Sequence, residues 1–186
     1  MGALAAAGAD LAAAARRGGG NLNWKRIFCH LLYLPLSARR AFPPQALDAI
    51  EEAIRACEET HQGEIRFAVE GSLGLMPLLR GQSARQRALE IFSALRVWDT
   101  EHNNGVLVYL LLADRDVEII ADRGVHRLVG DAAWEAVCRD MECAFRAGHF
   151  EAGVVSGIQA IGRQLTVSYP ASAVRPNELP DPPVVL

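Results

Sequence analysis

The spacing of apolar residues changes several times along the chain, and each change marks a predicted element. Residues 44–61 begin at the second of a pair of prolines and carry an apolar side chain every three or four positions, which predicts a helix. Residues 63–71, GEIRFAVEG, alternate and predict a strand. Residues 73–81 indicate a loop with apolar anchors. Ser83 and Gln86 then form a capping box that opens a helix, and we expect these residues to face inward from it: Ala88, Ile91, Phe92, Leu95 and Trp98.

The second half of the chain begins with the most apolar stretch, VLVYLLL at residues 106–112. Such an unbroken run predicts a central strand covered on both faces. Residues 113–116 are short enough for a hairpin turn into a second strand at 117–121. Two helices should follow, the first capped by Asp131 and the second ending before Pro170. Their predicted inward residues are Trp134, Val137, Cys138, Met141, Phe145, Val154, Ile158, Ile161 and Leu165.

This order of elements predicts an α/β fold, a three-layer α/β/α sandwich with a central mixed sheet. We assign the sandwich to residues 43–169. Residues 1–20 have low complexity, which suggests a disordered extension. A secretory signal is not expected there, because a basic region before the apolar stretch is missing. The tail, residues 170–186, is rich in proline and should be mostly extended.

Residues 21–42 join large apolar side chains to Lys25, Arg26, Arg39 and Arg40, without a single acid. Basic amphipathic segments of this kind lie on anionic membrane surfaces or dock on protein partners. The alternative is a helix that folds back on its own domain and is broken at Pro35. The sequence leaves both interpretations open.

Composition narrows the classes of function. A net charge of -3 argues against nucleic-acid binding by the domain. No apolar run reaches the ~20 residues that a transmembrane helix needs. The four cysteines form no CxxC pair and no zinc-type cluster with histidines, which suits free thiols in a reducing compartment. We therefore expect a cytoplasmic protein.

Polar residues gather at both ends of the predicted hairpin. Asp114, Arg115 and Asp116 occupy its turn. At the opposite end, Asn104 leads into the first strand and Asp122 leaves the second, so the two should meet. The residues that come just before Asn104 can join them there: Asp99, Glu101 and Asn103.

Carboxylate and amide oxygens in this arrangement suit a hard divalent cation, and we expect calcium ahead of magnesium. The proposed ligands are Asp99, Glu101, Asn103, Asn104 and Asp122. Two alternatives remain. Arg123 could pair with Asp99 or Glu101, or the asparagines could be turn residues and Asp99 a local cap. An EF-hand loop is excluded, because Asn104 stands at its glycine position and Leu110 at its closing glutamate.

The succession NNGVLVYLLLADRDVEIIADRG, a Trp-bearing helix and FRAGHFEAGVVSGIQAI resembles the TPM domain family over roughly residues 43–168. That family includes a thylakoid-lumen protein of photosystem II repair, a nematode receptor-modulating membrane protein and many bacterial proteins. The resemblance rests on the Asn104-Gly105 pair and on an F-x-x-G-x-[FY]-x-x-G signature that starts at Phe145. The resemblance implies an α/β/α fold and a divalent-cation site, and the plant member adds an acid-phosphatase activity as a possible function. Further matching positions are Asp114, Arg115, Asp122 and Gly124.

Three functions are therefore open. The first is a calcium-binding module that engages an unidentified protein partner or a membrane surface. The second is a metal-assisted phosphomonoesterase, in which Arg115 or Arg123 neutralises charge and His102 or Asp122 handles protons. In the third, the acidic residues are only the solvated end of a hairpin. Against the second, no G-x-S-x-G elbow, P-loop or HExxH motif is present.

Overall fold

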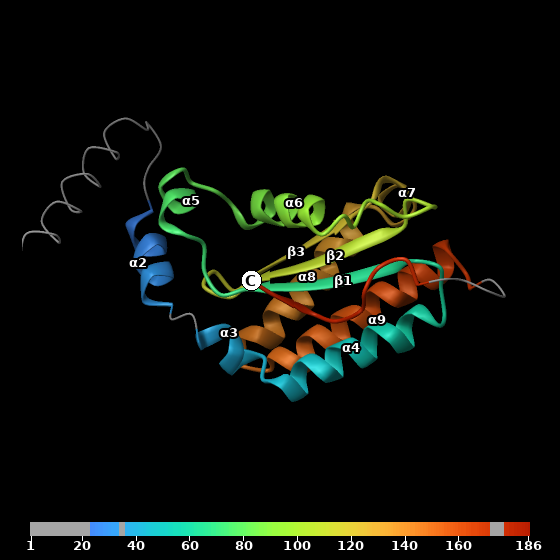
Figure 1. Ribbon diagram of the computed structural model, residues 1–186, viewed down its shortest axis with the longest axis horizontal. Helices are drawn as coiled ribbons and strands as arrows, with labels where there is room; N and C mark the ends of the chain where they lie inside the picture. The colour runs from blue at the N-terminus through green and yellow to red at the C-terminus, as the bar shows by residue number, and fades with distance from the viewer. Residues whose placement is uncertain (1–22, 34–35, 172–176) are drawn as a thin grey trace, which may run out of the picture.

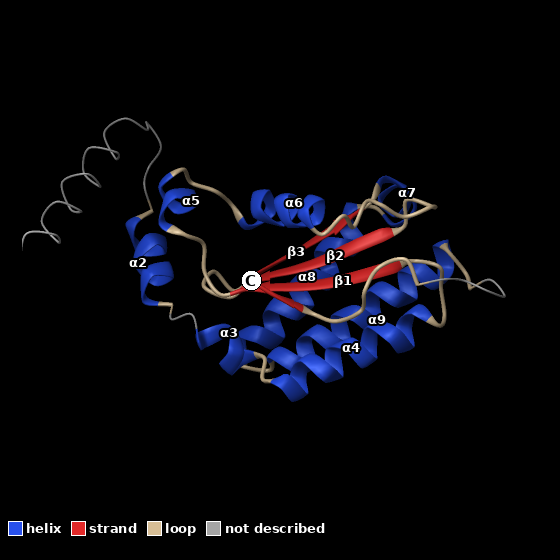
Figure 2. Ribbon diagram, viewed as in Figure 1, coloured by secondary structure: helices blue, strands red, loops and turns tan. Residues whose placement is uncertain are grey.

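The computed structural model describes residues 23–33, 36–171 and 177–186. The extension 1–20 and Pro35 lie outside these residues. The elements, drawn in Figures 1 and 2, are α2 (Trp24–Leu32), α3 (Leu36–Ala41), α4 (Pro44–Glu58), β1 (Glu64–Glu70), α5 (Leu75–Leu79), α6 (Ala84–Ala94), β2 (Gly105–Leu111), β3 (Asp116–Ala121), α7 (Arg123–Val129), α8 (Asp131–Arg146), α9 (Phe150–Ser168) and β4 (Val184–Val185).

The strands form one mixed sheet in the order β3-β2-β1-β4. β1 runs parallel to both β2 and β4, whereas β2 and β3 form the predicted antiparallel hairpin. Every residue of β2 is buried, which accounts for its unbroken apolarity. The last residues of the tail are extended and supply β4, an edge strand that the sequence reasoning missed.

Helices cover both faces of the sheet, as predicted. α4, α8 and α9 pack on one face, and α6 covers the other (Figure 1). The alternation of β1 divides its side chains between two cores: Phe67 belongs to the core under α4, α8 and α9, and Ala68 to the core under α6. The three-layer α/β/α sandwich is therefore confirmed.

Two predicted boundaries are wrong. The stretch 73–81 contains a short helix, α5, and Pro77 does not prevent it because this residue lies in the first turn, where a missing N–H is tolerated. The helix predicted to be capped by Asp131 has Gly130 as its cap, with a φ of 80°, and Asp131 is its first residue. A carboxylate there still interacts favourably with the helix dipole.

The chain between β2 and α6 also differs from the prediction at Trp98. Helix α6 ends at Ala94, and Arg96 takes a φ of 55°, which turns the chain away from the helix axis. Trp98 is 49% exposed and lies against the Arg96 guanidinium, instead of facing the core. The predicted capping box of Ser83 and Gln86 is present.

The basic segment folds back on the domain through one face of α2. Ile27 and His30 of this helix are buried. In the described part of the chain, no helix is both long and apolar enough to cross a membrane.

Candidate functional site

The open end of the β2–β3 hairpin brings Asn104 and Asp122 to neighbouring positions. The Asp122 N–H donates to the Gly105 carbonyl oxygen at 2.9 Å, which continues the strand register by one step. Asn104 is fully buried and Asp122 is 7% exposed. The structure therefore places the two residues at the same end of the hairpin, as predicted, one step apart in the strand register.

Asn104 is held by hydrogen bonds to the loops around it. Its N–H donates to Thr100 Oγ1 at 3.1 Å, its carbonyl accepts from the Glu64 N–H, and its Nδ2 donates to the Gln62 carbonyl. Its buried Oδ1 accepts no hydrogen bond from any described residue. These bonds fix the amide in one orientation and leave Oδ1 without a donor from the described residues.

Asp122 links the hairpin to the helix that follows it. Its Oδ1 accepts the Arg123 N–H at 2.6 Å and caps α7, a helix that the sequence reasoning missed. Its Oδ2 is buried and lacks a hydrogen-bond partner among the described residues. Buried acceptors are almost always satisfied in folded proteins, so each of these two oxygens calls for an explanation.

Gly124 brings further oxygens close to Asp122. A Cβ on Gly124 would lie 2.5 Å from the Asn103 carbonyl oxygen, 2.5 Å from the Tyr169 hydroxyl and 3.1 Å from the His102 carbonyl oxygen. Burial raises the pKa of Tyr169, and the nearby charge of Asp122 raises it further. The loop before β2, the start of α7 and the end of α9 therefore supply oxygens to one location.

The other predicted ligands lie on the surface. Asp99 forms an ion pair with Arg96 at 2.6 Å, so it is not the partner of Arg123. The side chains of Glu101 and Asn103 are exposed, and the Glu101 N–H donates to Glu178 Oε2. Asn103 has a φ of 52°, which turns the chain so that its carbonyl, not its side chain, reaches Gly124.

The donor set at this end consists of oxygens alone. Among residues 23–33, 36–171 and 177–186, no group of three or more His, Cys, Asp or Glu side chains could hold a metal ion. A zinc-type or multi-carboxylate site therefore does not describe this location. One carboxylate with amide, carbonyl and hydroxyl oxygens is a donor set that calcium accepts.

At the turn end of the hairpin, Asp114 is fully paired. Asp114 binds the Arg26 guanidinium, with Nη2 to Oδ2 at 2.7 Å, and accepts from His30 Nε2 at 2.9 Å. His30 Nδ1 accepts the Leu73 N–H at 3.0 Å, so the ring proton lies on Nε2. Burial would raise the pKa of Asp114, but the hydrogen bonds from Arg26 and His30 outweigh it and lower that pKa.

The two arginines predicted to neutralise a phosphate lie at opposite ends of the hairpin. Arg115 occupies the turn with a φ of 54° and is exposed. β3 has six residues, so the turn is about 20 Å from Asp122. Arg123, the first residue of α7, is the arginine at the Asp122 end. Arg115 therefore has no access to a ligand bound at Asp122.

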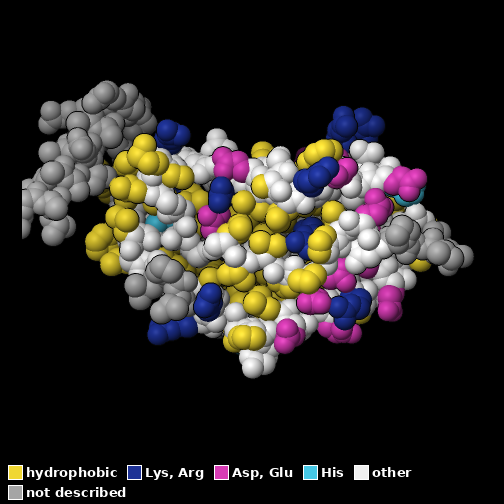
Figure 3. Space-filling model, viewed as in Figure 1, with side chains coloured by type: hydrophobic (Ala, Val, Ile, Leu, Met, Phe, Trp, Pro, Cys, Tyr) yellow, Lys and Arg dark blue, Asp and Glu magenta, His cyan; other side chains and the backbone are white. Residues whose placement is uncertain are grey.

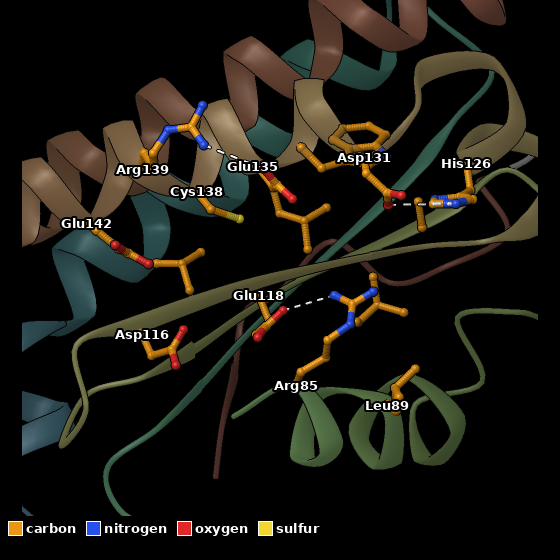
Figure 4. Close-up of a pocket in the computed structure, with 15 residues that line it drawn as sticks. Arg85, Leu89, Asp116, Glu118, His126, Asp131, Glu135, Cys138, Arg139 and Glu142 are labelled. Carbon is orange, nitrogen blue, oxygen red and sulfur yellow. Dashed lines mark hydrogen bonds and ion pairs between the residues drawn. The ribbon is translucent and has the colours of Figure 1, made fainter. Parts of the chain in front are cut away.

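A separate groove of about 720 Å³ follows the outer edge of β3, between α6 and α8 (Figure 4). Glu118 binds Arg85 at 3.0 Å, whereas Asp116 lies near the carboxylates of Glu118 and Glu142. Burial raises the pKa of Asp116 to about 6, with contributions from Glu118 and Glu142. None of the ligands predicted from the sequence lies in this groove, which is a separate acidic surface.

Comparison with known proteins agrees with this architecture. The TPM domain model matches residues 38–164. The BA42 protein of the psychrophilic bacterium Bizionia argentinensis is 29% identical, with a TM-score of 0.67, over 76% of this chain and 92% of that one. The N-terminal domain of a P. gingivalis protein shares the fold at 17% identity, with a TM-score of 0.58, over 76% of this chain and 95% of that one. No curated protein matches.

The family model covers most of the chain, which therefore belongs to the TPM domain family.

Proposed function

We propose that this TPM domain binds a divalent cation, calcium in preference to magnesium, between Asn104 and Asp122 and serves as a cation-dependent binding module. The observation that supports the proposal is the pair of buried oxygens, Asn104 Oδ1 and Asp122 Oδ2, which lack a hydrogen-bond partner among the described residues. A cation would satisfy both and would neutralise the buried carboxylate.

Calcium is favoured by the kind and placement of the donors. It takes six to eight oxygens with variable geometry, including backbone carbonyls and water. Asn104, Asp122, the His102 and Asn103 carbonyls and the Tyr169 hydroxyl supply oxygens of this kind from three segments. Magnesium demands near-ideal octahedral geometry at shorter distances, which such scattered donors suit less.

The test is thermal unfolding of the full chain in chelator and then across a calcium titration, with magnesium as the comparison. A ligand at a hundred times its Kd stabilises the folded state by about 2.7 kcal/mol. For a chain of this size, that free energy corresponds to a rise in Tm of about 5–10 °C. Calcium should give a saturating rise of this order, and magnesium a smaller one.

The decisive variant is Asp122→Asn, which keeps an oxygen to cap α7 but loses the charge. It should fold and lose the calcium response. Asp99→Asn and Glu101→Gln are matched controls, because both side chains are exposed, and they should respond like the wild type. If they abolish the response while Asp122→Asn keeps it, the site lies on the loop surface instead. A flat response of the wild type up to millimolar calcium would contradict the proposal.

A further inference from the structure

Helix α2 is attached to the domain by its polar face. Arg26 donates to both oxygens of Asp114 and, through Nη1, to the Gln82 carbonyl at 2.8 Å. His30, 2% exposed, bridges Asp114 and the Leu73 N–H. Only Ile27 adds a buried apolar side chain to this contact. The contact fixes the rotation of the helix about its axis.

This rotation turns the apolar stripe of α2 toward solvent. Trp24, Phe28, Leu31 and Leu32 stand at i, i+4, i+7 and i+8, the spacing by which a helix normally faces a core. Their exposed fractions are 53%, 62%, 60% and 62%. A stripe of four large apolar residues pointing outward is unusual for a helix that is already docked.

The neighbouring helix α5 extends this apolar surface. Leu75 and Met76 are 38% and 57% exposed, and α5 packs against α2. Figure 3 shows hydrophobic side chains gathered over α2 and α5, with Lys and Arg side chains above and below them. We call these six exposed side chains the α2–α5 patch.

The two stretches of sequence that form and flank the patch are basic, and the acid that contacts α2, Asp114, is paired with Arg26 and His30. Residues 21–47 and 71–89 contain no Asp or Glu, although the whole chain has a net charge of -3. Lys25, Arg39, Arg40 and Arg80 from these stretches are exposed. The basic residues next to the patch therefore complement an anionic surface, while the remainder of the chain carries an excess of acids.

From the apolar stripe, its exposed aromatic rings and the charge around it, we propose that the α2–α5 patch binds the surface of an anionic membrane. Trp24, Phe28 and the leucines would enter the boundary between headgroups and acyl chains, and the basic side chains would contact phosphates. A free helix of nine residues is marginal in water. The Asp114 contact holds α2 folded beforehand and lowers the entropy lost on binding.

The test is co-sedimentation of the full chain with vesicles of equimolar phosphatidylcholine and phosphatidylglycerol, and with vesicles of phosphatidylcholine alone. Binding to the anionic vesicles should be at least ten-fold tighter and should weaken as salt is added. Lys25→Gln should weaken it about five-fold, the effect of one basic residue at the membrane surface. The Trp24 contribution to fluorescence, taken as the difference from Trp24→Phe, should shift to shorter wavelength on binding.

Two double variants distinguish binding through the patch from non-specific binding by exposed apolar side chains. Phe28→Ser combined with Leu31→Ser should reduce binding more than ten-fold and leave the Tm unchanged, since both side chains are exposed. Leu128→Ser combined with Val167→Ser is the matched control, because these side chains are 60% and 84% exposed elsewhere. The control should bind vesicles like the wild type.

Three results would overturn the proposal. Equal vesicle binding by both double variants would show that the patch does not contribute to membrane binding. Self-association that Phe28→Ser and Leu31→Ser abolish, without vesicle binding, would assign the patch to a second copy. Trp24 fluorescence already shielded in vesicle-free solution would mean that the chain itself covers it. The binding measurement is made in chelator, and Asp122→Asn should behave like the wild type, so its outcome is independent of the cation site.

Discussion

Each end of the β2–β3 hairpin carries an aspartate, but the two aspartates differ in their partners. At the turn, Asp114 has every strong partner that a carboxylate needs, from Arg26 and His30. At the open end, Asp122 caps α7 with one oxygen, and its other oxygen is buried without a described partner. An aspartate therefore attaches a helix at one end of the hairpin, and at the other end an aspartate keeps one buried oxygen, where we propose a cation.

The difference shows that an acidic residue next to a strand carries little information alone. Its role depends on whether a basic side chain from another part of the fold reaches it. Arg26 lies 88 residues away from Asp114 in sequence and is brought to the turn by α2. No described arginine or lysine forms an ion pair with Asp122. Three substitutions test this contrast.

The largest effect is expected from Asp114→Ala. It leaves the buried His30 Nε2 and the partly buried Arg26 without their acceptor, which should cost about 2–3 kcal/mol in the free energy of unfolding. α2 should become accessible to protease, while calcium affinity stays unchanged. Denaturant unfolding and limited proteolysis measure both effects. Asp131→Ala, which removes a carboxylate that is 74% exposed, is the control: it should cost less than about 1 kcal/mol, the loss of its interaction with the α8 dipole, and leave α2 protected. An intact, protected α2 in Asp114→Ala would contradict the role of the contact.

An intermediate effect is expected from Gly124→Ala at the open end. The added Cβ would meet the Asn103 carbonyl oxygen at 2.5 Å, and a backbone atom cannot move aside cheaply. We expect a loss of about 1–3 kcal/mol together with loss of the calcium response. Calorimetry with and without calcium measures both. Gly71→Ala is the matched control, because its nearest neighbour would be the Ala38 Cβ at 3.9 Å. If Gly124→Ala bound calcium normally, the close approach of the Asn103 carbonyl to Gly124 would not be needed for the cation site.

The smallest effect, and a gain, is expected from Asp116→Asn. Burial raises the pKa of Asp116 to about 6 in the folded protein, above its unfolded value near 4. The folded state therefore holds this proton more tightly, and the contribution of Asp116 to stability falls as pH rises from about 4 to 6. Removing the charge should add about 1 kcal/mol at pH 7, after allowance for solvent screening. Denaturant unfolding at pH 4 and pH 7 checks this, with exposed Asp140→Asn as the control. An equal effect of Asp116→Asn at both pH values would show that its pKa is ordinary.

The fold was largely predictable because its strongest signals are local. The unbroken apolar run at residues 106–112 predicts a strand that is covered on both sides, and the hairpin geometry that follows places Asn104 beside Asp122. Helix α7 escaped prediction because it is seven residues long and buries only Val125 deeply, too little for a helical period to show. β4 escaped because two residues cannot establish an alternation.

The candidate site was only half predictable, because its remaining determinants are long-range. Asn104 could be named from the sequence, but the orientation of its amide depends on the Gln62 carbonyl, which belongs to the loop before β1. Tyr169 reaches Gly124 from the end of α9, and no local pattern connects them. Asp99 and Glu101 look equivalent to Asp122 in sequence, yet only Asp122 is withdrawn from water.

The position of β4 affects how the chain can fold as the ribosome makes it. Val184 and Val185 pair with β1, and the Leu186 N–H donates to the Val69 carbonyl at 2.9 Å. Until residues 184–186 have left the ribosome, β1 keeps an open edge with unpaired backbone groups, although the hairpin on its other side can already form. The nascent domain is then most prone to pairing with a second growing chain, and deleting residues 184–186 would leave that edge of β1 open in the folded domain.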